Sequence, residues 1–103
     1  MLFLVNTELK GQYPVPPEQW MELVVKTLEV IRTHKREEKL IFHGAFVGRH
    51  GGIFVWDVDS LTELQAFMTQ LPLWPFMECE IVPILSTEEA EESAKQAQAA
   101  LGR

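Results

Sequence analysis

The order of strand-like and helix-like segments is the feature that most restricts the fold of this chain. Four apolar runs rich in β-forming residues predict strands, at residues 2–8, 40–48, 52–58 and 76–85. A helical repeat of apolar residues predicts a helix over residues 17–37, and the Ser60-x-x-Glu63 capping box predicts a second helix over residues 61–70. The resulting order is strand, helix, strand, strand, helix, strand. It is typical of a ferredoxin-like α+β domain with the βαββαβ pattern.

The C-terminal segment continues beyond this unit. Ser86-x-x-Glu89 is another capping box, and acidic residues crowd the start of the alanine-rich run that follows. We therefore expect one ferredoxin-like domain at residues 1–85 and a peripheral helical extension at residues 86–103.

Charge and composition exclude several classes of partner. The net charge is −6 and no basic stripe exists, so nucleic acid and anionic membranes are poor partners. No apolar run approaches the ~20 residues of a membrane-spanning helix, and the N-terminus lacks the basic region of a signal peptide. Because Cys79 is the single cysteine, no internal disulfide can form. These features predict a cytoplasmic protein.

Two apolar features predict self-association. On the first helix, apolar residues cover an arc wider than the ~100° stripe of a helix that packs on one sheet; the central line is Trp20, Val24, Leu28 and Ile31. The connection "TQLPLWPFMECEIVPI", residues 69–84, is also apolar where a polar loop would be ordinary. Because exposed apolar patches usually mark interfaces, we expect at least a dimer, with this corner buried in the assembly.

The opening "MLF" and the segment "WDVDSLTELQAFMTQLPLWPFMECEI" resemble the muconolactone delta-isomerase family. The resemblance covers roughly residues 1–85, and "QLPLWPFM" is its most specific part. It implies a dimeric α+β barrel, assembly into rings as large as a decamer, and no metal or organic cofactor. It also implies proton transfer within a small unsaturated lactone during aromatic catabolism. The family's second strand carries arginine and histidine. The corresponding stretch here, "LIFHGAFVGR", instead has the apolar residues Ile41, Phe42 and Ala45, and this is a departure from the family pattern.

His43 is the candidate catalytic base. It interrupts an apolar strand and, by alternation, shares a face with Ile41, Ala45 and Val47. An ordinary histidine pKa of about 6.5 suits proton exchange at neutral pH. The alternative is a hydrogen-bonded histidine of the core.

Carboxylates supply further candidates for acid–base chemistry. Glu22 and Lys26 are four residues apart on the first helix, so they are either an acid and a substrate anchor or a solvated ion pair. Glu80 lies in the last strand, where it is either a buried base with a raised pKa or a residue at a solvent edge.

Four residues are candidates for substrate binding. Asn6 and Tyr13 could donate a hydrogen bond to a lactone oxygen, although an edge group and a packing residue are equally compatible with the sequence. Arg49, beside His50 in the predicted "RHGG" hairpin, could hold a carboxylate, although turn residues are usually solvated. Trp56 could form a platform for the substrate ring, but a tryptophan in such a strand is more often a core residue. No phosphate-binding loop or zinc-type spacing is present, so no metal site is predicted.

Three functions fit the sequence. The first is an isomerase-like enzyme acting on a small anionic lactone. The second is a binding or assembly module of the same fold that takes a small anionic or aromatic-derived ligand without chemistry. The third is another cofactor-free enzyme of the same barrel superfamily, such as a monooxygenase. The absence of a basic residue inside the apolar strands favours the second or third. The "QLPLWPFM" corner supports the first only if it helps to form the cleft.

Overall fold

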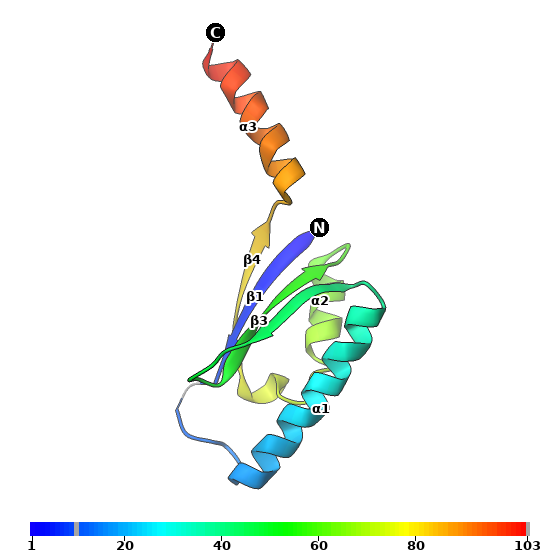
Figure 1. Ribbon diagram of the computed structural model, residues 1–103, viewed down its shortest axis with the longest axis vertical. Helices are drawn as coiled ribbons and strands as arrows, with labels where there is room; N and C mark the ends of the chain where they lie inside the picture. The colour runs from blue at the N-terminus through cyan, green and yellow to red at the C-terminus, as the bar shows by residue number, and fades with distance from the viewer. Residues whose placement is uncertain (10, 103) are drawn as a thin grey trace.

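The computed structural model describes residues 1–9 and 11–102, and its elements follow the predicted order (Figure 1). They are β1 (Leu2–Glu8), α1 (Pro17–Arg36), β2 (Leu40–Ala45), β3 (Gly51–Asp57), α2 (Leu61–Met68), the 3₁₀ turn η1 (Trp74–Phe76), β4 (Glu78–Ile84) and α3 (Thr87–Leu101). The strands form one antiparallel sheet in the order β2-β3-β1-β4. This arrangement confirms the ferredoxin-like α+β fold with an additional C-terminal helix.

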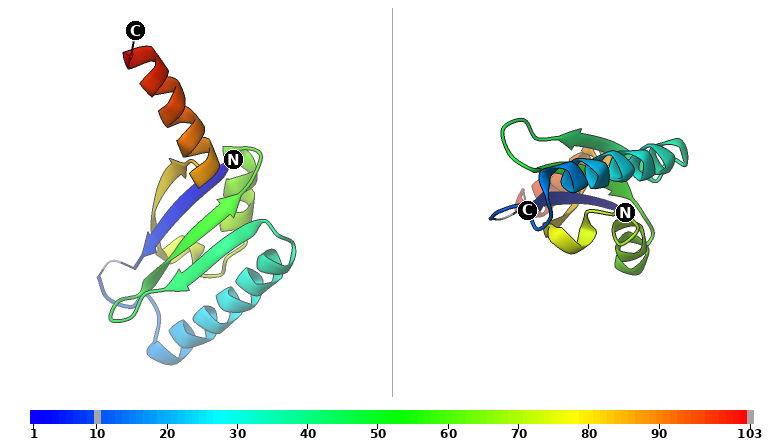
Figure 2. Two further views of the ribbon diagram at one scale, coloured as in Figure 1. Left: turned by 45° about the horizontal axis from the view of Figure 1, so that its top comes forward. Right: turned by 90° about the horizontal axis from the view of Figure 1, so that it is seen from below.

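The two faces of the sheet differ. Along β1, Phe3, Val5 and Thr7 are buried, whereas the residues between them are only partly buried. The first set faces α1 and α2, and together they form the core, whose largest members include Phe3, Trp56, Leu64 and Met68. The opposite face has no helix of the same chain packed on it in the views of Figures 1 and 2. The helices of one chain therefore cover only one side of the sheet.

Element boundaries differ from the predicted ones where the chain turns. β2 ends at Ala45 instead of residue 48, because Gly48 takes a left-handed conformation with φ +92° in the hairpin. β4 begins at Glu78, because Trp74–Phe76 forms a 3₁₀ turn before it. The pairing of β2 with β3 also shifts register between Leu40 and Phe42.

The buried side of α1 differs from the predicted stripe. Trp20 and Ile31 are buried as expected, but the other buried positions are Thr27 and His34, and Leu28 is 40 % exposed. The cause is polar contact with the connection after α2. The Thr27 hydroxyl accepts a hydrogen bond from the Leu73 N–H at 3.2 Å. These contacts turn α1 toward the connection and leave part of its apolar arc in solvent.

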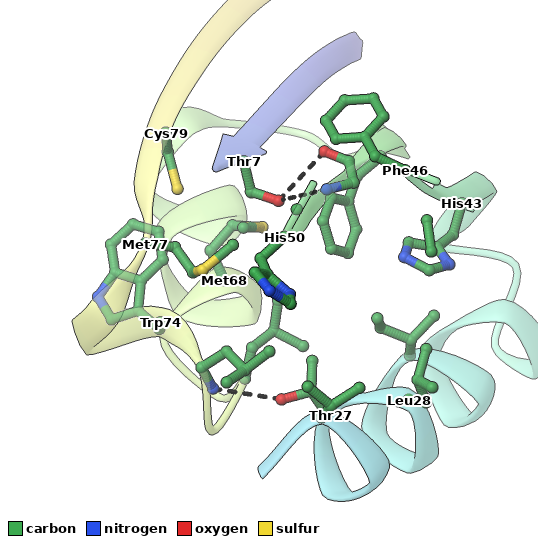
Figure 3. Close-up of a pocket in the computed structure, with 18 of the residues that line it drawn as sticks. Thr7, Thr27, Leu28, His43, Phe46, His50, Met68, Trp74, Met77 and Cys79 are labelled. Atoms are coloured by element: carbon green, nitrogen blue, oxygen red, sulfur yellow. Dashed lines mark hydrogen bonds between the residues drawn. The ribbon is translucent and has the colours of Figure 1, made fainter. Parts of the chain in front are cut away.

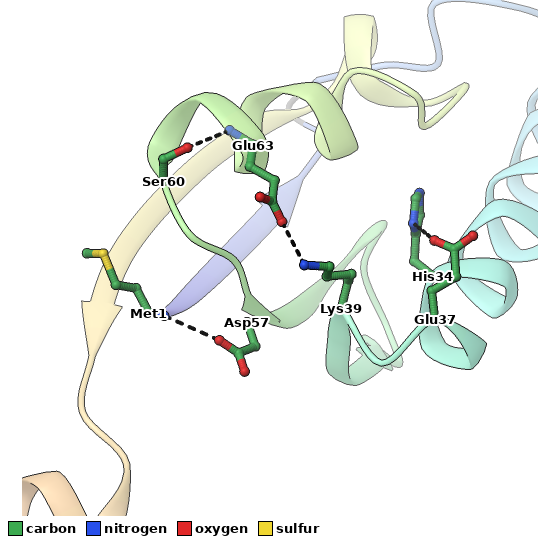
Figure 4. Close-up of polar contacts among 7 residues, drawn as sticks. All are labelled: Met1, His34, Glu37, Lys39, Asp57, Ser60 and Glu63. Carbon is green, nitrogen blue, oxygen red and sulfur yellow. Dashed lines mark hydrogen bonds and ion pairs between the residues drawn. The ribbon is translucent and has the colours of Figure 1, made fainter.

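Polar contacts connect the C-terminal end of α1 and the residues after it with α2 and the segment that follows α2 (Figure 4). Nε2 of His34 lies 2.9 Å from Oε1 of Gln70, and Nδ1 lies 3.4 Å from a carboxylate oxygen of Glu37. Lys39 pairs with Glu63 at 3.2 Å, and this hydrogen bond and charge raise the pKa of the Lys39 ammonium group. The end of α1 is thus tied to α2 and to the segment that follows it.

The apolar connection has a role within one chain. Leu71 is 4 % exposed and belongs to the core, and Trp74 packs against that core from the 3₁₀ turn. The prediction that a second subunit buries this corner stays a prediction. The packing of Leu71 and Trp74 already accounts for the apolar character of residues 71–77.

α3 extends away from the sheet, and none of its residues is buried (Figure 1). Its predicted capping box is confirmed: Ser86 Oγ accepts from the Glu89 N–H at 3.1 Å, and the Glu89 carboxylate accepts from the Ser86 N–H at 3.0 Å. These bonds lower the pKa of the Glu89 carboxyl group. Within the described residues, no helix is long and apolar enough to cross a membrane.

Candidate active site between the sheet and the first helix

A cavity of about 180 Å³ lies between the helix-facing side of the sheet, α1 and the connection from α2 to β4 (Figure 3). Its lining is mostly apolar and includes Ile31, Phe54, Met68, Leu71 and Trp74. At about 30 Å³ per water molecule, this volume corresponds to about six waters. The cavity therefore has room for one small ring.

Glycines at the start of β3 bring its backbone close to its neighbours. Gly51 has φ +156°, and a Cβ there would lie 2.0 Å from the Thr7 carbonyl oxygen. A Cβ on Gly52 would lie 2.6 Å from the Gly44 carbonyl oxygen and 3.4 Å from Nε2 of His43. Larger residues would therefore push β3 away from both neighbouring strands and crowd the His43 ring.

His43 reaches the cavity from β2. It pairs with Phe54 across the β2–β3 ladder, and the two ring centroids are 4.8 Å apart. Partial burial, with a smaller effect of the Lys35 charge, lowers the pKa of His43 below its ordinary value. The imidazole is therefore neutral at pH 7 and can accept a proton. Ile41 lies at the register shift and is 54 % exposed, so Phe54 and not Ile41 provides the apolar contact.

The mouth of the cavity carries the positive and hydrogen-bonding groups. Arg49 lines it from the β2–β3 hairpin, with its guanidinium carbon 4.2 Å from the centroid of the Phe46 ring. A guanidinium nitrogen of Arg49 lies 3.8 Å from a Glu8 carboxylate oxygen. His50, the next residue, also lines the cavity, and its Nε2 lies 2.7 Å from the Tyr13 hydroxyl oxygen. His50 is exposed, as is usual for a turn residue, but its ring is in contact with Tyr13.

Four of the predicted site residues lie elsewhere. Lys26 and Glu22 form an exposed ion pair at 3.3 Å on α1, which matches the solvated alternative. Asn6 and Glu80 are register partners in the β1–β4 ladder, and Glu80 is exposed. By alternation they are on the face opposite to Thr7 and Cys79. Glu80 cannot orient His43, because β4 and β2 are opposite edges of the sheet.

Trp56 is a core residue and not a lining residue of the cavity. It is fully buried, and its ring is nearly parallel to that of Phe67, with centroids 5.4 Å apart. Its indole nitrogen is buried and finds no hydrogen-bond acceptor within residues 1–9 and 11–102. A substrate platform at this position is therefore excluded by packing.

The sequence interpretation missed three polar residues of the lining, namely Thr7, Thr27 and Cys79. The period of two in β1 places Thr7 on the face of Phe3 and Val5, so its position could have been inferred. Cys79 is the register partner of Thr7, and burial raises the pKa of its thiol. Cys79 is therefore part of the cavity wall.

The described residues contain no group of three or more histidine, cysteine or acidic side chains that could hold a metal ion. The acid–base groups that line the cavity are instead His43, His50 and Cys79, with Arg49 as a fixed cation. This set can exchange a proton and bind an anion.

Comparisons with known proteins agree with this chemistry. Residues 1–90 match the family model described as muconolactone delta-isomerase. A muconolactone delta-isomerase from Rhodococcus opacus is 29 % identical over 83 residues, which cover 81 % of this chain and 89 % of the relative. A second, from Pseudomonas aeruginosa, is 28 % identical over 81 residues, which cover 79 % of this chain and 84 % of the relative.

Two solved structures share the fold. The crystal structure of a muconolactone isomerase superposes with a TM-score of 0.73 at 27 % identity, covering 84 % of this chain and 90 % of that chain. A 5-chloro-2-hydroxyhydroquinone dehydrochlorinase from Burkholderia phenoliruptrix, solved with 2,5-dihydroxybenzoquinone, superposes with a TM-score of 0.68 at 15 % identity. That match covers 85 % of this chain and 97 % of the dehydrochlorinase chain.

Proposed function

Because the chain belongs to the muconolactone delta-isomerase family, we propose that its cavity catalyses proton transfer within a small unsaturated lactone of aromatic catabolism. The observation that carries this proposal is the position of His43. It is a titratable side chain in an apolar cavity, and its lowered pKa keeps it in the proton-accepting form. Such a group suits general-base removal of a carbon-bound proton.

The reaction needs no second reactant. The His43 imidazole takes a proton from one ring carbon, and the electron pair moves through the double bond onto the lactone carbonyl oxygen. The imidazolium then returns a proton to another carbon of the conjugated system, so the double bond shifts and the imidazole is regenerated. The same group serves as base and then as acid, and atoms and charge balance.

The lining suggests how the ligand lies. Its ring fits among apolar side chains such as Leu71 and Phe54, and its carboxylate reaches the mouth, where Arg49 supplies the charge. Arg49 is about half exposed and its Glu8 contact is long, so it can pair with a ligand carboxylate. This arrangement places the reacting ring, and not its charged arm, beside His43.

The alternative is a module that binds such a ligand without turning it over. It is favoured by the lack of any carboxylate among the described lining residues, which leaves His43 without an acidic partner in the cavity. The isomerase and the binding module would use the same ligand site, and a measurement of turnover distinguishes them.

We also propose that two or more copies associate through the open face of the sheet. Apolar residues lie there beside polar ones, and Val82 of β4 is 36 % exposed in a single chain. A partner sheet would remove this apolar surface from water. A cytoplasmic location is part of the same proposal and is tested by cell fractionation.

The direct experiment is to incubate the protein with muconolactone in D₂O and to follow the ring protons by NMR. We expect a shifted double bond, with deuterium at the carbon that receives the proton because His43 is only partly buried. Glu22→Gln, which alters the exposed pair on α1, is the matched control and should react at the wild-type rate. Saturable binding without turnover would support the binding module, and absence of both would contradict a ligand site of this class.

A further inference from the structure

We propose that Tyr13 and His50 form a hydrogen-bonded pair that recognises the carboxylate of the ligand at the cavity mouth. The residue that keeps a free hydrogen makes the contact, and the other residue of the pair positions it. The identity of the ligand as an anionic lactone rests on the proposed function, but the preference for a carboxylate does not.

His50 is held more firmly than a hairpin residue needs to be. The Tyr13 hydroxyl lies 2.7 Å from its Nε2, and the two ring centroids are 4.9 Å apart. On another side, the ring of Trp20 meets His50 in an edge arrangement with centroids 6.0 Å apart. Trp20 is 1 % exposed and fixed in α1. The ring of His50, although exposed, is therefore in contact with Tyr13 on one side and Trp20 on another.

The pair retains a hydrogen-bond donor in either tautomer. A neutral imidazole carries one N–H and the tyrosine carries one O–H, and their mutual contact uses one of these hydrogens. If Tyr13 donates to Nε2, the Nδ1–H of His50 remains. If Nε2–H donates, the Tyr13 O–H remains. Nδ1 of His50 has no hydrogen bond to any residue that the structure describes, so no competing acceptor occupies it.

The position of His50 suits a charged arm. The residue lines the main cavity (Figure 3). It also lines a second hollow, whose wall includes Leu9, Gln12 and Tyr13. It thus lies where the enclosed space meets solvent. A ligand with its ring inside would place a substituent there, beside the Arg49 cation. Arg49 is shared with Glu8, whereas the Tyr13–His50 pair contains no anion.

The test compares a carboxylate with its ester. Affinities of muconolactone and its methyl ester are measured by calorimetry on the wild type, Tyr13→Phe, His50→Phe and the double variant. We expect the wild type to prefer the carboxylate. Tyr13→Phe keeps the ring and removes only the hydroxyl, so it should weaken carboxylate binding about fivefold, the size of one hydrogen bond, and leave the ester unchanged. The double variant should resemble His50→Phe, because the two residues act as one unit.

Lys26→Gln is the matched control, since it removes an exposed cation of α1 away from the cavity and should alter neither affinity. A wild type with no preference for the carboxylate would overturn the proposal. So would a Tyr13→Phe variant that weakens both ligands equally or neither. If the lactone neither binds nor reacts, the proposed function fails, and benzoate against methyl benzoate then decides the carboxylate preference by the same criteria.

Discussion

Thr7 and Gly52 exchange two hydrogen bonds across the β1–β3 pair. The Thr7 hydroxyl donates to the Gly52 carbonyl oxygen at 3.1 Å and accepts from the Gly52 N–H at 3.1 Å (Figure 3). Both groups are buried, so this contact fixes β3 against β1 at the wall of the cavity.

Thr7→Val should therefore destabilise the protein. Valine keeps the shape of threonine but loses both hydrogen bonds, and the free energy of unfolding should fall by about 1–3 kcal/mol. Urea denaturation measures the change. Thr69→Val is the matched control, because the Thr69 hydroxyl bonds the Ala66 carbonyl oxygen at an exposed helix end. Equal stability of the two variants would show that the Thr7–Gly52 contact contributes little.

Cys79 provides a chemical probe of the cavity. Burial raises the pKa of its thiol, and only the thiolate reacts readily with iodoacetamide. The folded protein should therefore be alkylated more slowly at pH 8 than the urea-unfolded chain, and its rate should keep rising at higher pH. A ligand in the cavity should slow the reaction further. Mass spectrometry follows the modification, and a rate equal to that of the unfolded chain would place Cys79 outside the cavity wall.

The sequence predicts the fold well because the fold depends on local signals. Capping at Ser60 and Ser86 and the order of periodic segments specify the elements and hence the sheet. The face of His43 is only partly predictable, because the register shift between Leu40 and Phe42 interrupts the alternation of β2. Ala45 lines the cavity together with His43, whereas Ile41 is exposed.

The rest of the site depends on contacts between distant segments. Glu80 could be a buried base only while the strand order was unknown, and the structure places it, exposed, on an edge strand. The ring of His50 is in contact with Tyr13, which is 37 residues away. Likewise, Thr27 is buried where it accepts a hydrogen bond from Leu73, which is 46 residues away. The helical repeat of apolar residues in α1 cannot predict such a contact.

The open face of the sheet should mediate self-association. Val82→Glu places a charge on this face, where a partner sheet would bury it without a counter-ion. We expect the variant to be smaller by light scattering at micromolar concentration and to keep the wild-type circular dichroism. Leu61→Glu is the control, because Leu61 is 61 % exposed on α2, away from the sheet face. A wild type that is monomeric at this concentration would contradict the prediction.

Removal of α3 should leave the rest of the fold intact. None of its residues is buried, and its contacts are mostly within the helix, such as the Lys95–Glu91 pair at 3.0 Å. A chain that ends at Thr87 should therefore remain folded, with a urea midpoint close to that of the full protein. The circular dichroism should change only by the loss of one exposed helix. Loss of the cooperative unfolding transition would show that α3 packs on a surface of the assembly.

His43 should control turnover far more than stability. Without its base, the reaction should slow by about 100-fold or more in His43→Ala, as is usual when a general base is removed. Because His43 lines a cavity and is only partly buried, its loss should change the melting temperature little. A histidine with a structural role in the core would instead cost on the order of 1–3 kcal/mol.

The pH dependence of turnover and of stability further separates a catalytic His43 from a structural one. The pKa of His43 is lowered in the folded protein, so the base form persists as the pH falls to the ordinary histidine value of about 6.5. Turnover should stay constant there and fall only below the folded pKa. Because the unfolded chain takes up this proton first, wild-type stability should decrease as the pH drops below about 6.5, and His43→Ala should lack that part of the decrease. An inactive but stable variant with this altered pH profile supports His43 as the base, whereas an unstable variant, or an active one, contradicts it.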